Sequence, residues 1–151
     1  MPGPNDLMCR LVANDEDQAA CLELRRQVFI EEQQVPEEIE RDTDDASALH
    51  FLACEGEHPI AVARVVEKKQ AVAKIGRVAV VASRRGEGVG AELMAFVLAT
   101  LTERGFTEAL LHSQEPVVGF YEKLGFAVEG ERFFEAEIPH FAMRKRLQST
   151  G

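Results

Sequence analysis

A glycine-rich turn between an apolar strand and a helix is the feature that most constrains this chain. Residues 72–81 form the strand candidate, an apolar helix follows from 91 to 104, and between them glycines alternate at Gly86, Gly88 and Gly90. Glycine has no Cβ, so its backbone N–H groups can approach a ligand closely. N–H groups at a helix N-terminus are unpaired and attract anions. The turn therefore predicts a binding site for a pyrophosphate group.

Two common nucleotide-binding motifs do not fit this turn. No Lys-Ser/Thr pair follows the last glycine, which excludes a Walker A loop. The G-x-G-x-G spacing also differs from the dinucleotide fingerprint, and no acidic residue ends a second strand about 20 residues later. Arg84 and Arg85 add fixed positive charge beside the turn, unless their side chains face solvent.

The remaining patterns predict one α+β domain spanning residues 1–151. Strands are expected at 7–12, 49–55, 60–66, 72–81, 109–112, 126–134 and 141–147, with a hairpin turn at 56–59. Helices are expected from the capping cluster at 14–17 to about residue 29, at 91–104 and at 117–124, with a broken helix and loop at 31–48. This order predicts a three-layer fold: a mixed, mostly antiparallel sheet of six to seven strands with helices on both faces.

Two motifs together resemble those of one enzyme superfamily. Arg85-x-x-Gly88-x-Gly90, after the strand 78–80, resembles the acetyl-CoA signature of the GCN5-related N-acetyltransferase (GNAT) superfamily. About 30 residues later, the segment 119–126 (Gly-Phe-Tyr-Glu-Lys-Leu-Gly-Phe) resembles the later GNAT motif, in which a helix carries a tyrosine beside the coenzyme sulfur. Within the superfamily, segments 24–33, 40–45 and 138–140 resemble the ElaA-like group.

The resemblance implies that acetyl-CoA is the co-substrate and that strands four and five splay apart to admit its pantetheine arm. The Val80 N–H would stabilise negative charge on the acetyl oxygen, and the backbones of Val78 and Val81 would pair with the pantetheine amides. Gln114 stands near the position of an asparagine that many members carry. The residues implied to contact the coenzyme are Val78, Val80, Arg84, Arg85, Gly86, Gly88, Val89, Gly90, Gln114, Phe120 and Tyr121.

Acetyl transfer from a thioester to an amine needs a proton donor for the thiolate and a base for the amine. Resemblance makes Tyr121, the single tyrosine of the chain, the donor; the alternative is an aromatic ring packed on Phe126. No carboxylate stands early in strand four, so Glu32, His112 and His140 are the base candidates. Imidazole has a suitable pKa near neutrality, and a chain of water molecules would be another route.

The acceptor is expected to be a primary amine on a small molecule or a peptide. Polyamine, amino sugar, antibiotic, peptide N-terminus and lysine all stay open. We predict that its pocket is formed by Phe29, Glu32, Gln33, His112 and His140. The acidic run 37–45 either attracts a cationic acceptor or forms a solvated loop.

Composition narrows the partners and the compartment. A net charge of −9 argues against nucleic-acid binding and is compatible with a cationic amine. Cys9, Cys21 and Cys54 are scattered, which predicts free thiols in a reducing compartment and no zinc site. No signal peptide is visible, and the apolar stretch 93–101 is too short to span a membrane. We expect a cytoplasmic protein with no metal and no membrane partner, and we leave homodimer formation open.

Two other functional classes compete with an acetyltransferase. A non-catalytic acyl-CoA sensor would keep the pyrophosphate site and lack an organised acceptor pocket. An interaction module that has lost coenzyme binding is a third interpretation, which the intact Arg85–Gly90 turn disfavours.

Overall fold

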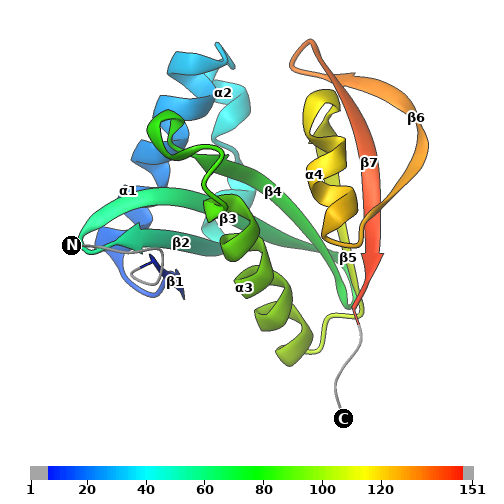
Figure 1. The fold of residues 1–151 in the computed structure, drawn as a ribbon, viewed down its shortest axis with the longest axis horizontal. Helices are drawn as coiled ribbons and strands as arrows, with labels where there is room; N and C mark the ends of the chain where they lie inside the picture. Colours follow the sequence, from blue (N-terminus) through cyan, green and yellow to red (C-terminus); the bar gives the residue numbers. More distant parts are fainter. Residues whose placement is uncertain (1–6, 148–151) are drawn as a thin grey trace.

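The computed structural model describes residues 7–147 and shows a seven-stranded sheet between helices (Figure 1). The strand order is β1-β2-β3-β4-β5-β7-β6, and only β4 and β5 are parallel neighbours. The strands are β1 (Leu7–Leu11), β2 (Leu49–Glu55), β3 (His58–Lys69), β4 (Val72–Val80), β5 (Glu108–Gln114), β6 (Ala127–Glu135) and β7 (Ile138–Arg146). The predicted mixed, mostly antiparallel sheet is confirmed.

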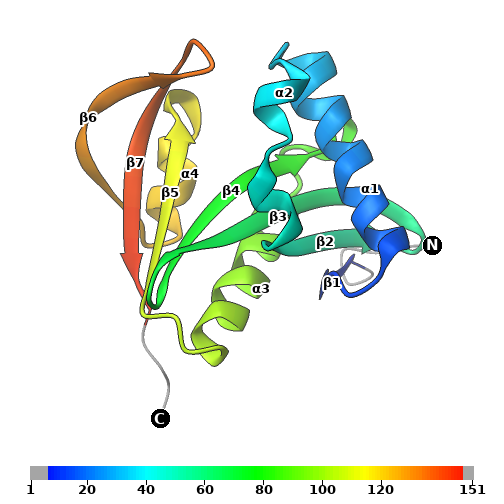
Figure 2. The same ribbon diagram turned by 180° about the vertical axis from the view of Figure 1, so that it is seen from behind.

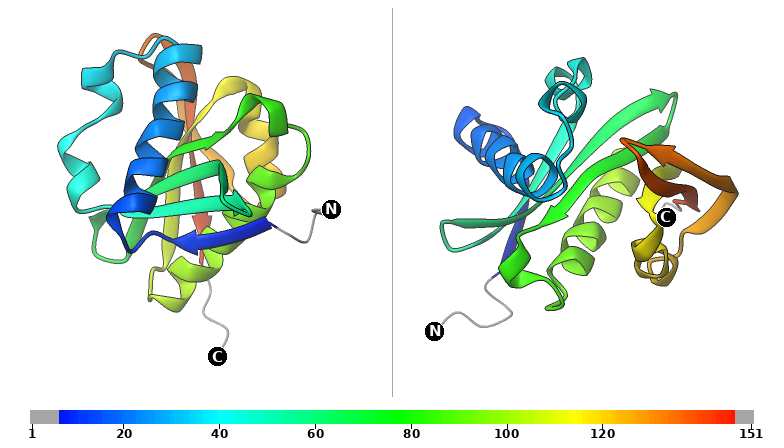
Figure 3. Two further views of the ribbon diagram at one scale, coloured as in Figure 1. Left: turned by 90° about the vertical axis from the view of Figure 1, so that its left-hand side faces the viewer. Right: turned by 90° about the horizontal axis from the view of Figure 1, so that it is seen from above.

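Helices cover both faces of the sheet, as predicted (Figures 2 and 3). One face carries α1 (Asp15–Arg25) and α2 (Glu37–Glu40), and the other carries α3 (Val89–Glu103) and α4 (Val118–Lys123). Each face has its own apolar cluster. The cluster under α3 includes the fully buried Leu93, Val97 and Leu101, which recur every four residues along one side of the helix. The short helical segments are η2 (Arg26–Glu32), η3 (Thr43–Ala46), η4 (Ala82–Arg84) and η5 (Glu115–Val117).

β3 and β7 extend further than their sequence patterns predict because the turns beside them are tight, and β5 also extends, to Glu108–Gln114 instead of 109–112. β3 spans His58–Lys69 instead of 60–66, since the preceding turn takes up two residues and begins with Gly56 at a φ of 61°. β7 begins at Ile138 instead of 141, after a turn in which Ala136 and Glu137 have φ values of 48° and 64°. The longer strands give more backbone groups a hydrogen-bond partner.

The first helix continues past its expected end as a π-helix. α1 ends at Arg25, and η2 carries the helical path to Glu32, beyond the predicted end near residue 29. Its wider turn is visible in the hydrogen bond from the Gln33 N–H to the carbonyl of Val28, five residues earlier (3.1 Å). π-helical turns are rare and frequently occur at functional sites. Here the turn places Glu32 and Gln33 at the end of the helical layer.

The parallel strands β4 and β5 pair only over their first halves. Val72–Ile75 pairs with Glu108–Leu111, and the pairing then stops. Just beyond this point the register of β4 on β3 shifts, and Arg77 has a φ of 53°. A bulge of this kind bends its strand and increases the twist, which accounts for the divergence of β4 from β5. The splayed strands implied by the resemblance are therefore present, and His112 is the first residue of β5 beyond the paired part.

The acidic run 37–45 is partly buried in ion pairs. Arg25 Nε donates to Glu40 Oε2 (2.7 Å), both side chains are 1% exposed, and Arg77 binds the same oxygen (3.1 Å). Burial tends to raise the pKa of Asp45, but hydrogen bonds from its arginine partners, Arg25 among them, outweigh burial and lower it. The paired carboxylates of Glu40 and Asp45 fit neither of the two expectations, a surface that attracts a cationic acceptor or a solvated loop. Glu40 instead connects α2 to α1 and to the bulge of β4, and Asp45 connects η3 to α1 and to Arg64 of β3.

Candidate active site

The glycine-rich turn ends at an uncapped helix N-terminus. Gly88 has a left-handed φ of 85°, and α3 begins directly after it at Val89, two residues before the predicted start. No side chain caps this end, and a hydrogen bond from the Glu92 N–H to the Gly88 carbonyl (3.1 Å) closes the first turn. The N–H groups of Val89, Gly90 and Ala91 lie in that first turn, where a helix supplies no acceptor. These free donors lie where the sequence predicts an anion site, and that site stays a prediction.

This turn packs closely against two other elements. A Cβ placed on Gly90 would lie 3.4 Å from Phe120 Cζ and 3.6 Å from Val80 Cγ2. The N-terminus of α3 therefore lies directly on α4 and β4, and the side chains of Val78 and Val80 pack on this same face of the sheet. Gly86 has open space around it and a φ of 79°, so its role is to reverse the chain direction.

Both arginines of the turn are bound to carboxylates from other parts of the chain. Arg84 donates to Glu55 (2.8 Å) and to Glu87 (2.7 Å). Arg85 donates two hydrogen bonds to Glu32, of 2.6 and 2.8 Å. The two guanidiniums are thus paired, but the side chain of Arg85 is still 41% exposed and that of Arg84 27%, so the solvent-facing alternative stays open for Arg85. A phosphate in the turn would compete with these carboxylates for the same donors.

The open edge of β4 presents the backbone of Val80. The Val81 N–H donates to the Ile60 carbonyl of β3 (2.9 Å), and the Val81 carbonyl accepts from the Arg84 N–H (3.0 Å). Backbone groups of successive strand residues point to opposite edges, so those of Val80 face away from β3. The hydrogen bond from Arg85 Nε to the Val80 carbonyl (3.0 Å) shows this direction. The Val81 N–H is bound to β3, so only the Val81 carbonyl, which accepts one hydrogen bond, could take part in the pairing that the resemblance implied.

Tyr121 lies in the core on the α3 face. Its side chain is 7% exposed, and its ring makes edge contacts with Phe120 (5.0 Å between centroids) and Phe126 (6.0 Å). The same buried cluster contains Ile75 and Leu111, the last paired residues of β4 and β5. Burial raises the pKa of the Tyr121 hydroxyl above its ordinary value of 10.0. The hydroxyl therefore stays protonated at neutral pH, and its ring packs on Phe126 at the same time.

His112 and His140 meet at one carboxylate on the opposite face. Leu111 and Ser113 are buried, so the alternation of the strand directs His112 away from α3. His112 Nδ1 lies 2.5 Å from Glu135 Oε1, and His140 Nε2 lies 3.8 Å from Glu135 Oε2. The sequence candidates His112 and His140 are therefore neighbours, joined by a side chain that the motifs did not identify.

The ring of Phe133 packs against both imidazoles. It meets His112 edge-on at 5.0 Å and stacks on His140 at 6.0 Å. His140 Nδ1 donates to the carbonyl of Ile138 (2.7 Å), because a carbonyl can only accept. The side chain of His140 is 10% exposed and that of His112 is 26% exposed. His112 is therefore the more accessible of the two.

Gln33 joins the π-helical turn to the end of β5. Gln114 Nε2 donates to Gln33 Oε1 (2.9 Å). In the sheet, Gln114 pairs directly with His140 and lies two residues from His112. Gln33, His112 and His140 are thus gathered on one face, and Gln114, which we expected at the coenzyme, contacts Gln33.

Two other predicted acceptor residues have different surroundings. The carboxylate of Glu32 is bound to Arg85, and this hydrogen bond lowers the pKa of Glu32 below its usual range. Both effects make Glu32 a weaker base. Phe29 is half-buried and packs against the apolar cluster beneath α1.

Sequence reasoning missed Glu135 and Phe133. The sequence feature that could have identified them is the two-residue turn after β6. This turn pairs Glu135 with Ile138 and Phe133 with His140. Residues two apart on a strand share a face, so Phe133 and Glu135 could have been placed beside His140 once the hairpin was recognised.

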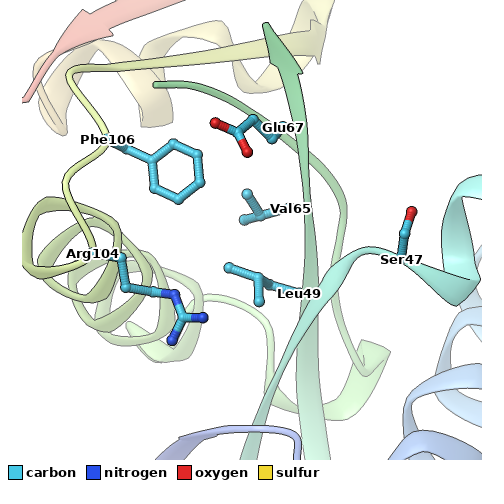
Figure 4. A pocket seen from close by; sticks show the side chains of 6 residues that line it. All are labelled: Ser47, Leu49, Val65, Glu67, Arg104 and Phe106. Atoms are coloured by element: carbon cyan, nitrogen blue, oxygen red, sulfur yellow. The ribbon is translucent and has the colours of Figure 1, made fainter. Parts of the chain in front are cut away.

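Other features of the described chain lie outside this site. Within residues 7–147, no helix is long and apolar enough to cross a membrane. Over the same range, no three His, Cys, Asp or Glu side chains are arranged to hold a metal ion. A pocket at the C-terminal end of α3 is lined by Ser47, Leu49, Val65, Glu67, Arg104 and Phe106 (Figure 4). The length of α3, about 22 Å for its 15 residues, separates this pocket from the glycine-rich turn.

Comparison with known proteins identifies the class to which this chain belongs. Residues 12–147 match the family described as an acetyltransferase (GNAT) domain. The uncharacterized N-acetyltransferase YjcF of Bacillus subtilis is 32% identical over 89% of this chain and 96% of its own. A crystal structure from Lactobacillus plantarum, named as an N-acetyltransferase, superposes with a TM-score of 0.90 at 28% identity, covering 95% of this chain and 100% of that one.

The chain therefore belongs to the GNAT family and is an acetyltransferase; the family takes its acyl group from coenzyme A thioesters. Within the family it is similar to ElaA of Escherichia coli, as the segments 24–33 and 138–140 indicated. The two sequences are 33% identical over 85% of this chain and 86% of ElaA. The crystal structure of ElaA superposes with a TM-score of 0.83 at 28% identity, covering 92% of this chain and 99% of that one.

Proposed function

We propose that this protein transfers an acetyl group from acetyl-CoA directly to a primary amine. The observation that carries the proposal is the opening between β4 and β5, with Tyr121 in the core on one face and His112 on the other. A thioester lying in this opening has its leaving sulfur on the α3 side and its acetyl carbon open to the other face. Acid and base are then separated by the reacting group, as a displacement at that carbon requires.

We assign coenzyme binding to the backbone of the glycine-rich turn and to its two arginines. The N–H groups of the first turn of α3 would hold the pyrophosphate, and Arg84 and Arg85 would exchange their carboxylate partners for phosphate oxygens. The Val80 N–H points into the opening and would stabilise the negative charge that develops on the acetyl oxygen.

The chemical step uses one base and one acid. The amine nitrogen forms a bond to the acetyl carbon while the carbon–sulfur bond breaks, and His112 Nε2 takes the proton that the nitrogen loses. Tyr121 gives its proton to the departing thiolate and recovers one from solvent. His112 serves as the base better than Glu32, which is bound to Arg85, or His140, which is nearly buried.

Transfer without an acetyl-cysteine step agrees with the placement of the thiols. Cys9, Cys21 and Cys54 are free, and the latter two are buried. Burial raises the pKa of Cys21 to about 12, which leaves almost no thiolate at neutral pH. Free thiols also agree with a reducing compartment, so we place the reaction in the cytoplasm.

An acceptor panel tests the proposal. We would incubate the full-length chain with acetyl-CoA and spermidine, glucosamine, kanamycin, L-lysine or a peptide with a free N-terminal alanine, and follow release of free CoA. At least one amine should give saturable release of CoA. His112→Ala should reduce this release at least about tenfold, a smaller loss than the removal of a proton-transfer group usually causes. Tight CoA binding with no amine-dependent release would instead favour the acyl-CoA sensor.

Glu32→Gln is expected to tighten CoA binding. The change removes the carboxylate that competes with phosphate for Arg85, while Gln keeps the size of the side chain. This ion pair is partly exposed (41% and 42%), so its free energy is at most about 1 kcal/mol, or up to about fivefold in Kd. Calorimetric titration measures the change. The matched control is Glu31→Gln, because Glu31 binds Arg26 and not the turn. An unchanged Kd in Glu32→Gln would show that CoA does not compete for Arg85.

A further inference from the structure

We propose that Glu135 is a positioning residue that holds His112 in the tautomer and orientation of a general base. Glu135 stands at the end of β6, outside both coenzyme motifs, and its carboxylate reaches His112 on β5 across β7. The inference rests on the proposed function, because it assumes that His112 takes the proton of the amine.

The contact with Glu135 decides which nitrogen of His112 is free. An ionised carboxylate has only acceptor atoms, so the proton in the contact belongs to His112 Nδ1. Neutral His112 then keeps its lone pair on Nε2, the nitrogen that can take a proton from an acceptor. The hydrogen bond from His112 lowers the pKa of Glu135, and the nearby His140 and Lys74 lower it further, so Glu135 is ionised at neutral pH.

The titratable groups around His112 come from three strands. Glu135 lies on β6, His140 on β7, and Lys74 on β4, on the same face of the sheet. Burial lowers the pKa of Lys74, whereas Glu135 acts in the opposite direction. His140 is farther from the carboxylate than His112, at 3.8 Å, and its Nδ1 is already bound to a backbone carbonyl. Glu135 therefore acts mainly on His112.

The carboxylate takes no proton in this scheme. As the amine proton moves to His112 Nε2, the imidazole ring becomes a cation with a proton on each nitrogen. Its Nδ1–H still donates to the ionised Glu135. The hydrogen bond becomes an ion pair, which stabilises the charge that appears during the reaction. The proton later leaves Nε2 for solvent, and Glu135 stays ionised throughout.

Imidazole tautomers measured by NMR test the contact without any acceptor. Long-range proton–nitrogen spectra of full-length, ¹⁵N-histidine-labelled protein resolve four histidines, and His112→Gln assigns the signal of His112. Neutral His112 should carry its proton on Nδ1 in the native chain and in Glu135→Gln, whose side-chain oxygen still accepts. It should lose this preference in Glu135→Ala. A mixed tautomer in the native chain would overturn the proposal.

A rescue experiment tests the catalytic consequence, using the best acceptor of the panel. Glu135→Ala removes the acceptor of the His112 Nδ1 proton, so it should lower kcat and leave the KM for acetyl-CoA unchanged, whereas Glu135→Gln still accepts and should recover part of the lost kcat. The matched control is Glu129→Ala on the same strand, because Glu129 binds Arg144 and not His112. Its kcat should stay native. A purely structural role of Glu135 would lower activity equally in both Glu135 variants.

The two measurements separate this inference from the proposed function. If no panel amine releases CoA, the proposed transferase activity fails, and the tautomer spectra still show whether Glu135 orients His112. If CoA is released but Glu135→Ala keeps the native kcat, the activity stands and the role of Glu135 is wrong.

Discussion

Gly88→Val is expected to weaken CoA binding about a hundredfold while the fold persists. Gly88 has a φ of 85° directly before α3, a conformation that a β-branched residue adopts at a cost of about 1–3 kcal/mol. No atom lies within 4 Å of the new Cβ, so strain and not a clash drives the change. The strain is relieved when the turn rearranges, and the N–H groups of the first turn of α3 then lose their common direction.

Calorimetric titration of CoA measures the effect, and far-UV circular dichroism with thermal unfolding checks the fold. The matched control is Gly130→Val, since Gly130 has a φ of 80° and equally open surroundings on β6, away from the turn. Gly130→Val should carry a similar backbone strain and bind CoA normally. Equal loss of affinity in both variants would mean that the effect is a general loss of stability.

The glycine-rich turn was predictable because its physical requirements are local. Gly86 and Gly88 have the positive φ values that only glycine adopts easily, and the helix begins directly after them. Apolar runs bounded by turn residues likewise predicted the strands, because central strands such as β2 and β3 are buried on both faces of the sheet. The two motifs led to the correct family for the same reason, since they encode local backbone geometry and not long-range contacts.

The acceptor side was less predictable because its contacts join residues far apart in the sequence. Gln33 and Gln114 are 81 residues apart, and Arg85 binds Glu32 across 53 residues. No local pattern encodes such pairs. The π-helical turn is a similar case, since it becomes evident only from the hydrogen bond between Gln33 and Val28.

The acidic run shows how a charge pattern misleads when its partners are unknown. A sequence of carboxylates suggests a solvated or cation-binding surface. In the structure Glu40 is 1% exposed and is bound by Arg25 and Arg77, one residue on a helix and the other on a strand. Burial of a carboxylate requires such partners, and only the fold reveals which arginines supply them.

Tyr121→Phe is expected to lower kcat about 10²–10³-fold, within the usual range for loss of a proton donor. The change removes one oxygen and keeps the ring contacts with Phe120 and Phe126, so stability should change little. Acetyl-CoA should bind within about twofold of the native affinity, because the hydroxyl acts on charge that appears only as the thiolate leaves. Burial raises the pKa of Tyr121, so the native hydroxyl stays protonated up to at least its ordinary range, and turnover should not fall through its ionisation between pH 6 and about 9.

Single-turnover experiments with enzyme in excess of acetyl-CoA isolate the chemical step from product release. The rate of thiol release in Tyr121→Phe should recover partly when the leaving thiol is more acidic than CoA, since a better leaving group needs less help from an acid. Acetyl thioesters of aromatic thiols provide that comparison. Phe126→Leu is the matched control, because it alters packing beside Tyr121 and leaves the hydroxyl in place. A native single-turnover rate in Tyr121→Phe would exclude Tyr121 as the acid and would assign protonation of the thiolate to solvent.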